Sequence, residues 1–221
     1  MTEAEWMTSD DPIAMHDVVA EGAFKFGWPD GPRTARKRLL FCLACCPLVW
    51  PLIEADERCR NWVEWTDRNL EGSANKEEEE ELVLGAKIAA EHPDDDTPHN
   101  QMMAANLVYD LGDPHPWIFH LVRTFDDWGD VKQRTRDVAA LLRCIAGNPF
   151  RPITFDPTWR SETVVSLASA IYAERAFDRM PILADALEDA GCDHADILSH
   201  CRRSGPHARG CWVVDGVLGK A

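Results

Sequence analysis

The chain has 221 residues, 45% hydrophobic and 28% charged, which is an ordinary balance for a folded protein with a sizeable core. The net charge of −15 disfavours nucleic acid and anionic membranes as partners and favours basic proteins. No apolar run approaches the ~18 residues of a membrane span, and the acidic N-terminus lacks the pattern of a secretory signal, so we expect a cytoplasmic protein.

Two helices are predicted in the first 50 residues. Asp11-Pro12 combines an N-cap with a proline at the first helical position, and Gly22 is placed to end that helix. A second helix is predicted from about Arg33 to Cys46. It should end there because Pro47 and Pro51 lack the amide donor and clash with the preceding turn.

A third helix is predicted to start near Asp56. Its apolar side has helical spacing and consists of Cys59, Trp62, Val63, Thr66 and Leu70. Asn75 followed by Glu78 is typical of a capping box, which predicts a fourth helix. The acidic run Glu77–Glu81 would lie in its first turns, where the helix macrodipole favours carboxylates.

Three further helices precede residue 147. Thr97-Pro98 repeats the cap-and-proline signal, and Gly112 is placed to end that helix. Residues 116–128 indicate another helix. The sharpest pattern predicts a helix over 131–146. Asp130 caps its start, and the glycine and proline of Gly147-Asn148-Pro149 end it.

A proline-rich crossing segment over 147–159 is followed by more helical patterns. They cover about 161–175, 181–190, 194–201 and 207–218, and Asp156-Pro157 and Asp178 to Pro181 are read as helix starts. No segment shows the sustained period of two that would indicate a strand.

The predicted fold class is therefore all-α, a helical bundle of about nine helices. The polar connector near residues 92–98 suggests two packed lobes, an N-terminal lobe over 1–92 and a C-terminal lobe over 98–221. One continuous domain is the alternative.

Several segments share motifs with a known family. They are Thr2–Trp6, Leu40–Cys46, Gly147–Pro152, Phe177–Leu187, His200–Arg202 and His207–Trp212. With these motifs the chain resembles a family of helical bacterial proteins that begin T-E-x-E-W and end H-x-R-G-C-W. The resemblance implies a helical fold and implies no activity, so no catalytic residue follows from it. The chain departs from the family at Pro47, where members carry basic residues, which implies a second helix that ends early.

The last third of the chain gathers cysteine and histidine. Eight cysteines without an export signal should stay reduced, so thiols are available as metal ligands. His207 and Cys211 are four residues apart and would project from one face if both are helical. Cys201 or His200 would add a ligand from the preceding helix, and Cys192 would close a tetrahedral site. Because thiolate and imidazole suit zinc, the candidate metal ligands are Cys201, His207 and Cys211.

Packing is the competing interpretation of the same residues. No C-x-x-C pair stands at the spacing of a zinc finger or ribbon. Cys201 and Cys211 would then be small buried side chains, with His200 and His207 at helix ends. In that case the protein needs no cofactor.

A second cysteine group, Cys42, Cys45 and Cys46, lies on one stripe of a predicted helix. The stripe could bind a soft metal or act as a redox pair. It does not start a helix after a strand, which is where a thioredoxin-like thiol gains its low pKa. Because the stripe continues an apolar face, close helix packing explains it better.

Charged clusters offer two further candidate sites. The basic run Arg33–Arg38 could bind a phosphate or an acidic partner, or could pair internally with the acidic helix that starts at Glu77. Arg179, Asp185 and Arg202 could bind an anionic ligand. Structural ion pairs are the competing interpretation of both clusters.

No serine–histidine–acid order, H-E-x-x-H motif or glycine-rich phosphate loop occurs in the chain. The leading hypothesis is therefore a non-catalytic protein-interaction or regulatory module of the bacterial cytoplasm. We expect a protein partner, which the acidic chain suggests is basic, and neither a membrane nor a nucleic acid. The alternative is a zinc-binding protein or enzyme with its site in the C-terminal cysteine and histidine cluster.

Overall fold

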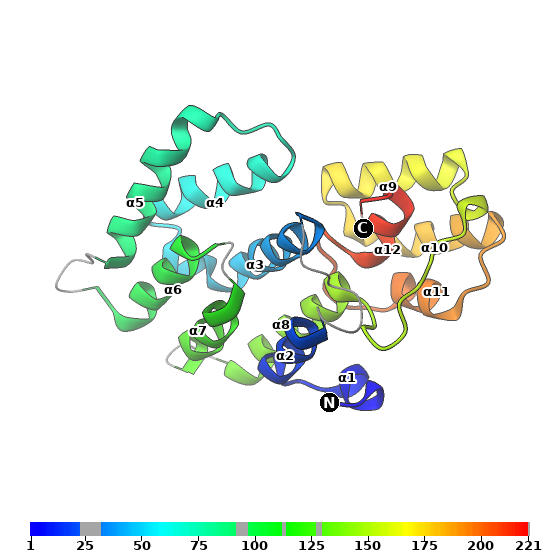
Figure 1. Ribbon diagram of the computed structural model, residues 1–221, viewed down its shortest axis with the longest axis horizontal. Helices are drawn as coiled ribbons and strands as arrows, with labels where there is room; N and C mark the ends of the chain where they lie inside the picture. Colours follow the sequence, from blue (N-terminus) through cyan, green and yellow to red (C-terminus); the bar gives the residue numbers. More distant parts are fainter. Residues whose placement is uncertain (23–31, 92–96, 112–113, 127–129, 221) are drawn as a thin grey trace.

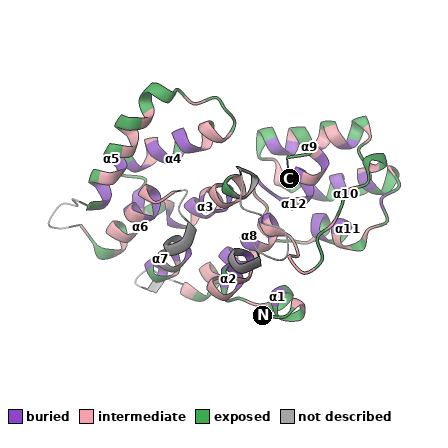
Figure 2. Cartoon of the chain, viewed as in Figure 1, coloured by how far each residue is buried: buried purple, intermediate pink, exposed green. Residues whose placement is uncertain are grey.

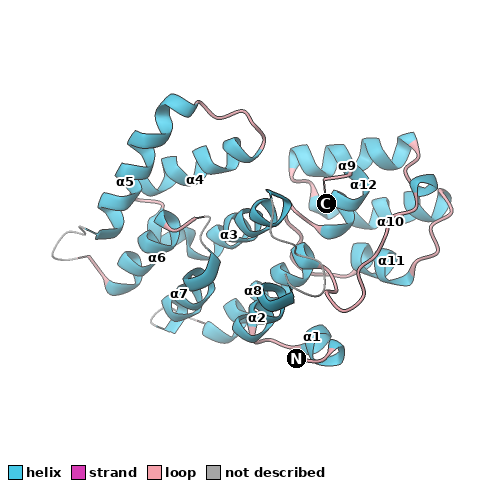
Figure 3. Ribbon diagram, in the orientation of Figure 1, coloured by secondary structure: helices cyan, strands magenta, loops and turns pink. Residues whose placement is uncertain are grey.

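The computed structural model describes residues 1–22, 32–91, 97–111, 114–126 and 130–220 (Figure 1). Most of these residues are helical and none of them lies in a strand, which confirms the predicted all-α class (Figure 3). The α-helices are α1 (Glu3–Thr8), α2 (Pro12–Gly22), α3 (Pro32–Ile53), α4 (Glu57–Leu70), α5 (Glu79–Glu91), α6 (His99–Tyr109), α7 (Pro114–Asp126), α8 (Val131–Ala146), α9 (Glu162–Glu174), α10 (Met180–Asp189), α11 (Ala195–Arg202) and α12 (Trp212–Leu218). Short 3₁₀ turns are η1 (Lys76–Glu78), η2 (Pro157–Trp159) and η3 (Phe177–Arg179). The described residues thus form 12 α-helices, somewhat more than the nine expected.

Several helices begin where polar caps predict. The carboxylates of Asp56 and Asp130 accept backbone amides at the starts of α4 and α8, and α8 has the predicted bounds. Asn75 caps the turn η1, which leads into α5. Pro181 lies in the first turn of α10 as expected, but Asp178 is inside η3 and does not cap a helix.

Helix α1 is absent from the predicted elements although its start carries a clear signal. The Thr2 hydroxyl accepts the Glu5 amide, and the Glu5 carboxylate accepts the Thr2 amide, which is a complete capping box. The helix buries Trp6, whose indole donates to the carbonyl of Gly147. A short helix of this kind is stable because its aromatic side chain packs on the core.

Helix α3 corrects the prediction that prolines end the second helix. It runs from Pro32 to Ile53 and contains Pro47 and Pro51. Both proline rings are exposed, whereas Cys45 and Val49 are buried. Burial of the apolar side therefore outweighs the hydrogen bonds that the prolines remove from the exposed side.

The buried residues form two hydrophobic clusters. Figure 2 marks the buried positions along the helices in purple. The first draws on the helices from α1 to α8, with α3 packed on α8 near the middle of the molecule (Figure 1). The second draws on α9, α10, α11 and α12, together with Cys144 from the last turn of α8. The boundary between the two clusters thus lies at the end of α8. The sequence suggested a boundary between lobes near residues 92–98, but α5 and α6, which lie on either side of that connector, pack on each other.

A network of charges joins the two clusters. Asp215 of α12 is fully buried, and its Oδ2 atom lies 2.8 Å from Arg36 and 2.7 Å from Lys37 of α3. Arg209 extends the network with ion pairs to Asp67 and Glu71 at 2.9 and 2.7 Å. The basic run therefore pairs internally through Arg36 and Lys37, but its described partner is Asp215 rather than the acidic helix α5.

Candidate metal centre

Four donor side chains from distant parts of the chain meet at the end of α8. Cys144, His200, His207 and Cys211 each place one ligand atom within 4.8 Å of those of the other three. Cys144 comes from α8, His200 comes from α11, and the other two come from the segment that joins α11 to α12. The group brings residues together that are up to 67 positions apart.

A turn, and not a helix, brings His207 and Cys211 together. Helix α12 begins at Trp212, so the prediction of a helix over 207–218 is wrong for its first residues. The Cys211 amide donates to the Ala208 carbonyl at 2.9 Å, and Gly210 has a φ of 90°. A side chain at Gly210 would be strained in this left-handed conformation, so glycine permits the turn that aims Cys211 at the group.

The spacing of the donors is close to that of a tetrahedral ion site. Cys144 Sγ lies 3.6 Å from His207 Nδ1, and His200 Nε2 lies 3.2 Å from Cys211 Sγ. With Zn–S of about 2.3 Å and Zn–N of about 2.1 Å, a tetrahedral site places sulfur and nitrogen about 3.6 Å apart. These two separations suit donors that share one tetrahedral ion, and all four donor atoms lie within 4.8 Å of one another.

Electrostatics in the group favour one thiolate. Burial opposes the ionisation of Cys211, but its hydrogen bonds with Cys144 and the histidines hold the pKa of this thiol well below its usual value. The pKa of Cys144 is raised well above its usual value, first by the hydrogen bond to Cys211 and then by burial. The two thiols therefore titrate as a coupled pair in which Cys211 is the easier one to ionise.

Trp212 fixes the orientation of His200. The indole nitrogen of Trp212 donates to His200 Nδ1 at 3.1 Å. Because an indole N–H only donates, Nδ1 carries no proton, and Nε2 of the neutral ring donates to Cys211 Sγ. Burial lowers the pKa of His200, which favours this neutral form.

The Nε2 atom of His207 is buried and has no hydrogen-bond partner among the described residues.

The structure places the predicted ligands differently from the sequence. His207 and Cys211 belong to the group, but Cys201 does not. Of the two residues proposed as the ligand from the preceding helix, Cys201 and His200, it is His200 that joins the group. Cys201 and Cys192 are buried in the second hydrophobic cluster. Burial raises the pKa of both thiols, which keeps them protonated.

Cys144 is the candidate ligand that the sequence did not indicate. It stands on the apolar side of α8 among residues such as Leu141 and Ile145, so it looks like any small buried residue. Its spacing of 56 residues from His200 follows no metal-binding motif. Only the packing of α8 against the C-terminal segment reveals its role.

The second cysteine group has the geometry of helix packing. Cys42, Cys45 and Cys46 are all buried on α3, and Cys46 donates to the Cys42 carbonyl at 3.4 Å. Burial raises the pKa of Cys46 to about 12 and that of Cys45 well above its usual value. These protonated thiols are poor nucleophiles and poor metal ligands.

The predicted anion-binding residues lie on the surface. Arg202 pairs with Asp185 at 2.8 Å and with Glu188, while Arg179 pairs with Glu174 at 3.0 Å. Arg202 and Asp185 retain 42% and 72% of their side-chain exposure. They form open ion pairs rather than the enclosed pocket that a ligand site requires, and exposed pairs of this kind contribute little stability.

Two cavities flank the metal group. A cavity of about 220 Å³ reaches His200 and Trp212, and one of about 500 Å³ reaches His207 between α3 and the C-terminal segment. The larger one has apolar walls from residues such as Leu43 and Leu141.

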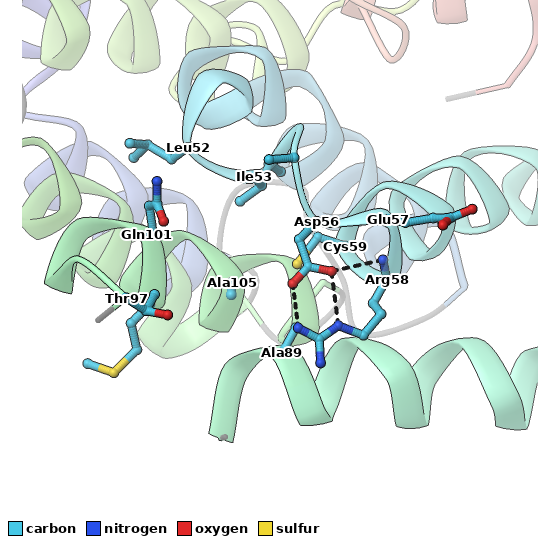
Figure 4. A pocket seen from close by; sticks show the side chains of 12 residues that line it. Leu52, Ile53, Asp56, Glu57, Arg58, Cys59, Ala89, Thr97, Gln101 and Ala105 are labelled. Carbon is cyan, nitrogen blue, oxygen red and sulfur yellow. Dashed lines mark hydrogen bonds and ion pairs between the residues drawn. The ribbon is translucent and has the colours of Figure 1, made fainter. Parts of the chain in front are cut away.

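A third cavity, of about 460 Å³, lies between α4, α5 and α6 (Figure 4). Asp56 and Arg58 face each other there and are joined by hydrogen bonds of 2.6 to 3.0 Å. Cys59 also lines it, and burial raises the pKa of that thiol to about 12. Of its ionisable groups, Asp56 and Arg58 pair with each other, Cys59 is protonated, and Glu57 is exposed.

Comparison of the chain with models of protein families, with curated proteins and with solved structures finds no match. Among the described helices, none combines the length and the apolarity needed to cross a membrane.

Proposed function

We propose that this chain is a zinc-binding helical protein in which Cys144, His200, His207 and Cys211 hold one structural ion. The convergence of four nitrogen and sulfur donors within 4.8 Å carries the proposal. The ion would join α8 to α11 and to the start of α12. It would thereby fix the C-terminal helices, several of which are too short to be stable alone.

The donor set favours zinc in a structural role. Two cysteines and two histidines are a common tetrahedral set for zinc, and four protein ligands leave no position for a substrate. Three of the four residues are buried and His207 is half-buried. Binding would also deprotonate Cys144 and neutralise both thiolates, which removes the cost of an isolated buried charge.

Trp212 sets a condition on this proposal. Zinc at His200 Nε2 would move the ring proton to Nδ1, where the Trp212 indole now donates. Zinc binding would therefore have to displace the Trp212 indole. If the indole keeps its place, the ion has three protein ligands and an open position, which is the arrangement of a catalytic zinc and keeps the enzyme alternative open.

Metal analysis of the purified protein tests the proposal. We expect one zinc per chain by plasma mass spectrometry, and a lower melting temperature after chelation. Cys144→Ser and Cys211→Ser should lose the ion, whereas Cys201→Ser, an equally buried control outside the group, should keep it. No zinc in the wild-type protein, even after zinc is added, would refute the proposal, as would equal loss from all three variants.

The absorption spectrum of the cobalt-substituted protein distinguishes four-ligand from open coordination. A strong tetrahedral spectrum with two sulfurs and two nitrogens supports the structural role. Trp212→Phe removes the indole donor, so it should tighten metal binding if His200 is a ligand. It should leave metal affinity unchanged if His200 stays outside the coordination shell.

A second candidate function, protein interaction, is supported by the surface of α5. Leu84 and Ile88 stand one turn apart and are 56% and 40% exposed, beside the exposed carboxylates of Glu81 and Glu91. An apolar face with an acidic border suits a basic amphipathic partner. In chemical cross-linking, Leu84→Lys should lose the partner that the wild type captures. The matched control Ile182→Lys, which changes an equally exposed residue on α10, should keep it. Equal capture by both variants would argue against this face.

A further inference from the structure

The 220 Å³ cavity beside the metal group contains two arginines. Arg143 of α8 and Arg203, which follows α11, both line it. The indoles of Trp6 and Trp212 also belong to its wall. The cavity is therefore positively charged in a chain whose net charge is −15.

Among the residues that the structure describes, none pairs with the charge of Arg203. Its Nε and Nη2 atoms are buried and form no hydrogen bond with the described residues, and no described carboxylate lies within 4.0 Å of it. The Asp196 carboxylate also lines the cavity, but it lies 3.8 Å from Arg151 instead. Arg203 as a whole is half-buried, so water solvates its charge incompletely, and this position favours an external counter-charge.

Arg143 is held in place without being neutralised. One of its nitrogens, Nη1, donates to the carbonyls of Trp6 and Ser9 at 3.0 and 2.8 Å. The Asp10 carboxylate attracts Arg143 at longer range but forms its ion pair with Arg136 at 3.0 Å. Arg143 thus adds a second fixed positive charge, which interacts unfavourably with Arg203.

We propose that this cavity binds a small oxyanion, a phosphate or carboxylate group, between Arg143 and Arg203. A planar guanidinium has a donor geometry that matches both groups. The volume corresponds to roughly seven waters at ~30 Å³ each, which suits a phosphate group or a carboxylate with a few carbon atoms. The site goes beyond the proposed zinc centre, because neither arginine belongs to the donor group.

Two adjacent arginines provide a matched pair of variants. Arg203→Met removes the unpaired charge from the cavity. Arg202→Met removes an equal charge from the preceding residue. Arg202 is exposed, pairs with carboxylates of α10 and lies outside the cavity. Both variants keep all four donor residues of the metal centre, so failure of one proposal is distinguishable from failure of the other by zinc content.

The experiment follows the melting temperature and tryptophan fluorescence of the whole chain. Inorganic phosphate and acetate are titrated separately while chloride keeps the ionic strength constant. For the anion that binds, we expect a saturable rise of about 5–10 °C at a hundredfold excess over Kd in the wild type and in Arg202→Met. Arg203→Met should show no saturable rise. Without either anion, Arg203→Met should melt higher than the wild type, because it removes a half-buried charge that has no partner among the described residues.

The relative response of the variants decides the outcome. A saturable effect of phosphate alone identifies a phosphate site, and one of acetate alone identifies a carboxylate site. The proposal is overturned if neither anion has a saturable effect, or if Arg203→Met responds as the wild type does. It is also overturned if Arg203→Met melts lower than the wild type in the absence of both anions.

Discussion

Asp215→Asn tests the buried charge network between the two hydrophobic clusters. The substitution keeps the shape of the side chain and removes the negative charge that lies 2.8 Å from Arg36 and 2.7 Å from Lys37. Arg36 and Lys37 are only 19% and 12% exposed, so water replaces the lost partner poorly. Removing one member of a buried ion pair costs about 3–5 kcal/mol.

The expected loss lies near the lower limit of that range. Arg36 also donates to the Tyr172 hydroxyl at 2.8 Å, and Lys37 donates to the Gly210 carbonyl at 2.6 Å. Arg36 also donates to the Lys220 carbonyl at 3.4 Å, so both cations keep at least one acceptor after the substitution. We expect a decrease of about 3 kcal/mol in the free energy of unfolding. For a chain of this length, that is a decrease of about 6–12 °C in melting temperature.

Urea unfolding followed by circular dichroism measures this loss. The control is Asp10→Asn, because Asp10 and Arg136 form an exposed pair with 56% and 48% side-chain exposure. Exposed pairs contribute less than about 1 kcal/mol. If Asp215→Asn costs no more than Asp10→Asn, the network does not stabilise the contact between the clusters and the reasoning is wrong.

Three further predictions concern stability. The pKa of Glu71 lies below its usual value because the Tyr172 hydroxyl and nearby cations outweigh burial. The free energy of unfolding should therefore fall as the pH decreases below about 4.5. Glu71→Gln should flatten this pH dependence when unfolding is measured at several pH values. Gly216→Ala would place a Cβ atom within 2.1 Å of the Phe155 ring and should cost about 1–3 kcal/mol, whereas Gly205→Ala, which meets nothing within 4 Å, should be neutral by the same urea assay. Trp6→Ala should lower the free energy of unfolding by about 3–5 kcal/mol, because the side chain is fully buried and its loss detaches α1; a loss below 1 kcal/mol would show that α1 docks weakly.

The sequence alone determined the all-α class and many helix positions. Helix α8 matches its prediction at both ends because its signals are local: Asp130 caps the first turn, apolar residues recur at helical spacing, and Gly147 adopts a positive φ at the end. The start of α4 at Asp56 follows for the same reason. Such signals act within a few residues, so they can be recognised without knowledge of the rest of the chain.

The tertiary structure decided the course of α3. Local proline chemistry predicts a break after Cys46, but one side of the helix is buried against neighbouring helices while Pro47 and Pro51 face solvent. The partner of the basic run was likewise decided by tertiary contacts, because Asp215 lies almost 180 residues from Arg36.

The residues of the candidate metal centre, too, are only partly predictable from the sequence. The sequence indicated His207 and Cys211 by spacing on a helix, yet they converge through a turn, and Cys144 joins them from α8. Periodicity and caps report interactions between neighbours in the chain, whereas a ligand set depends on which buried surfaces pack together. That packing depends on the combined shape and charge of all the helices, so only the folded chain defines the site.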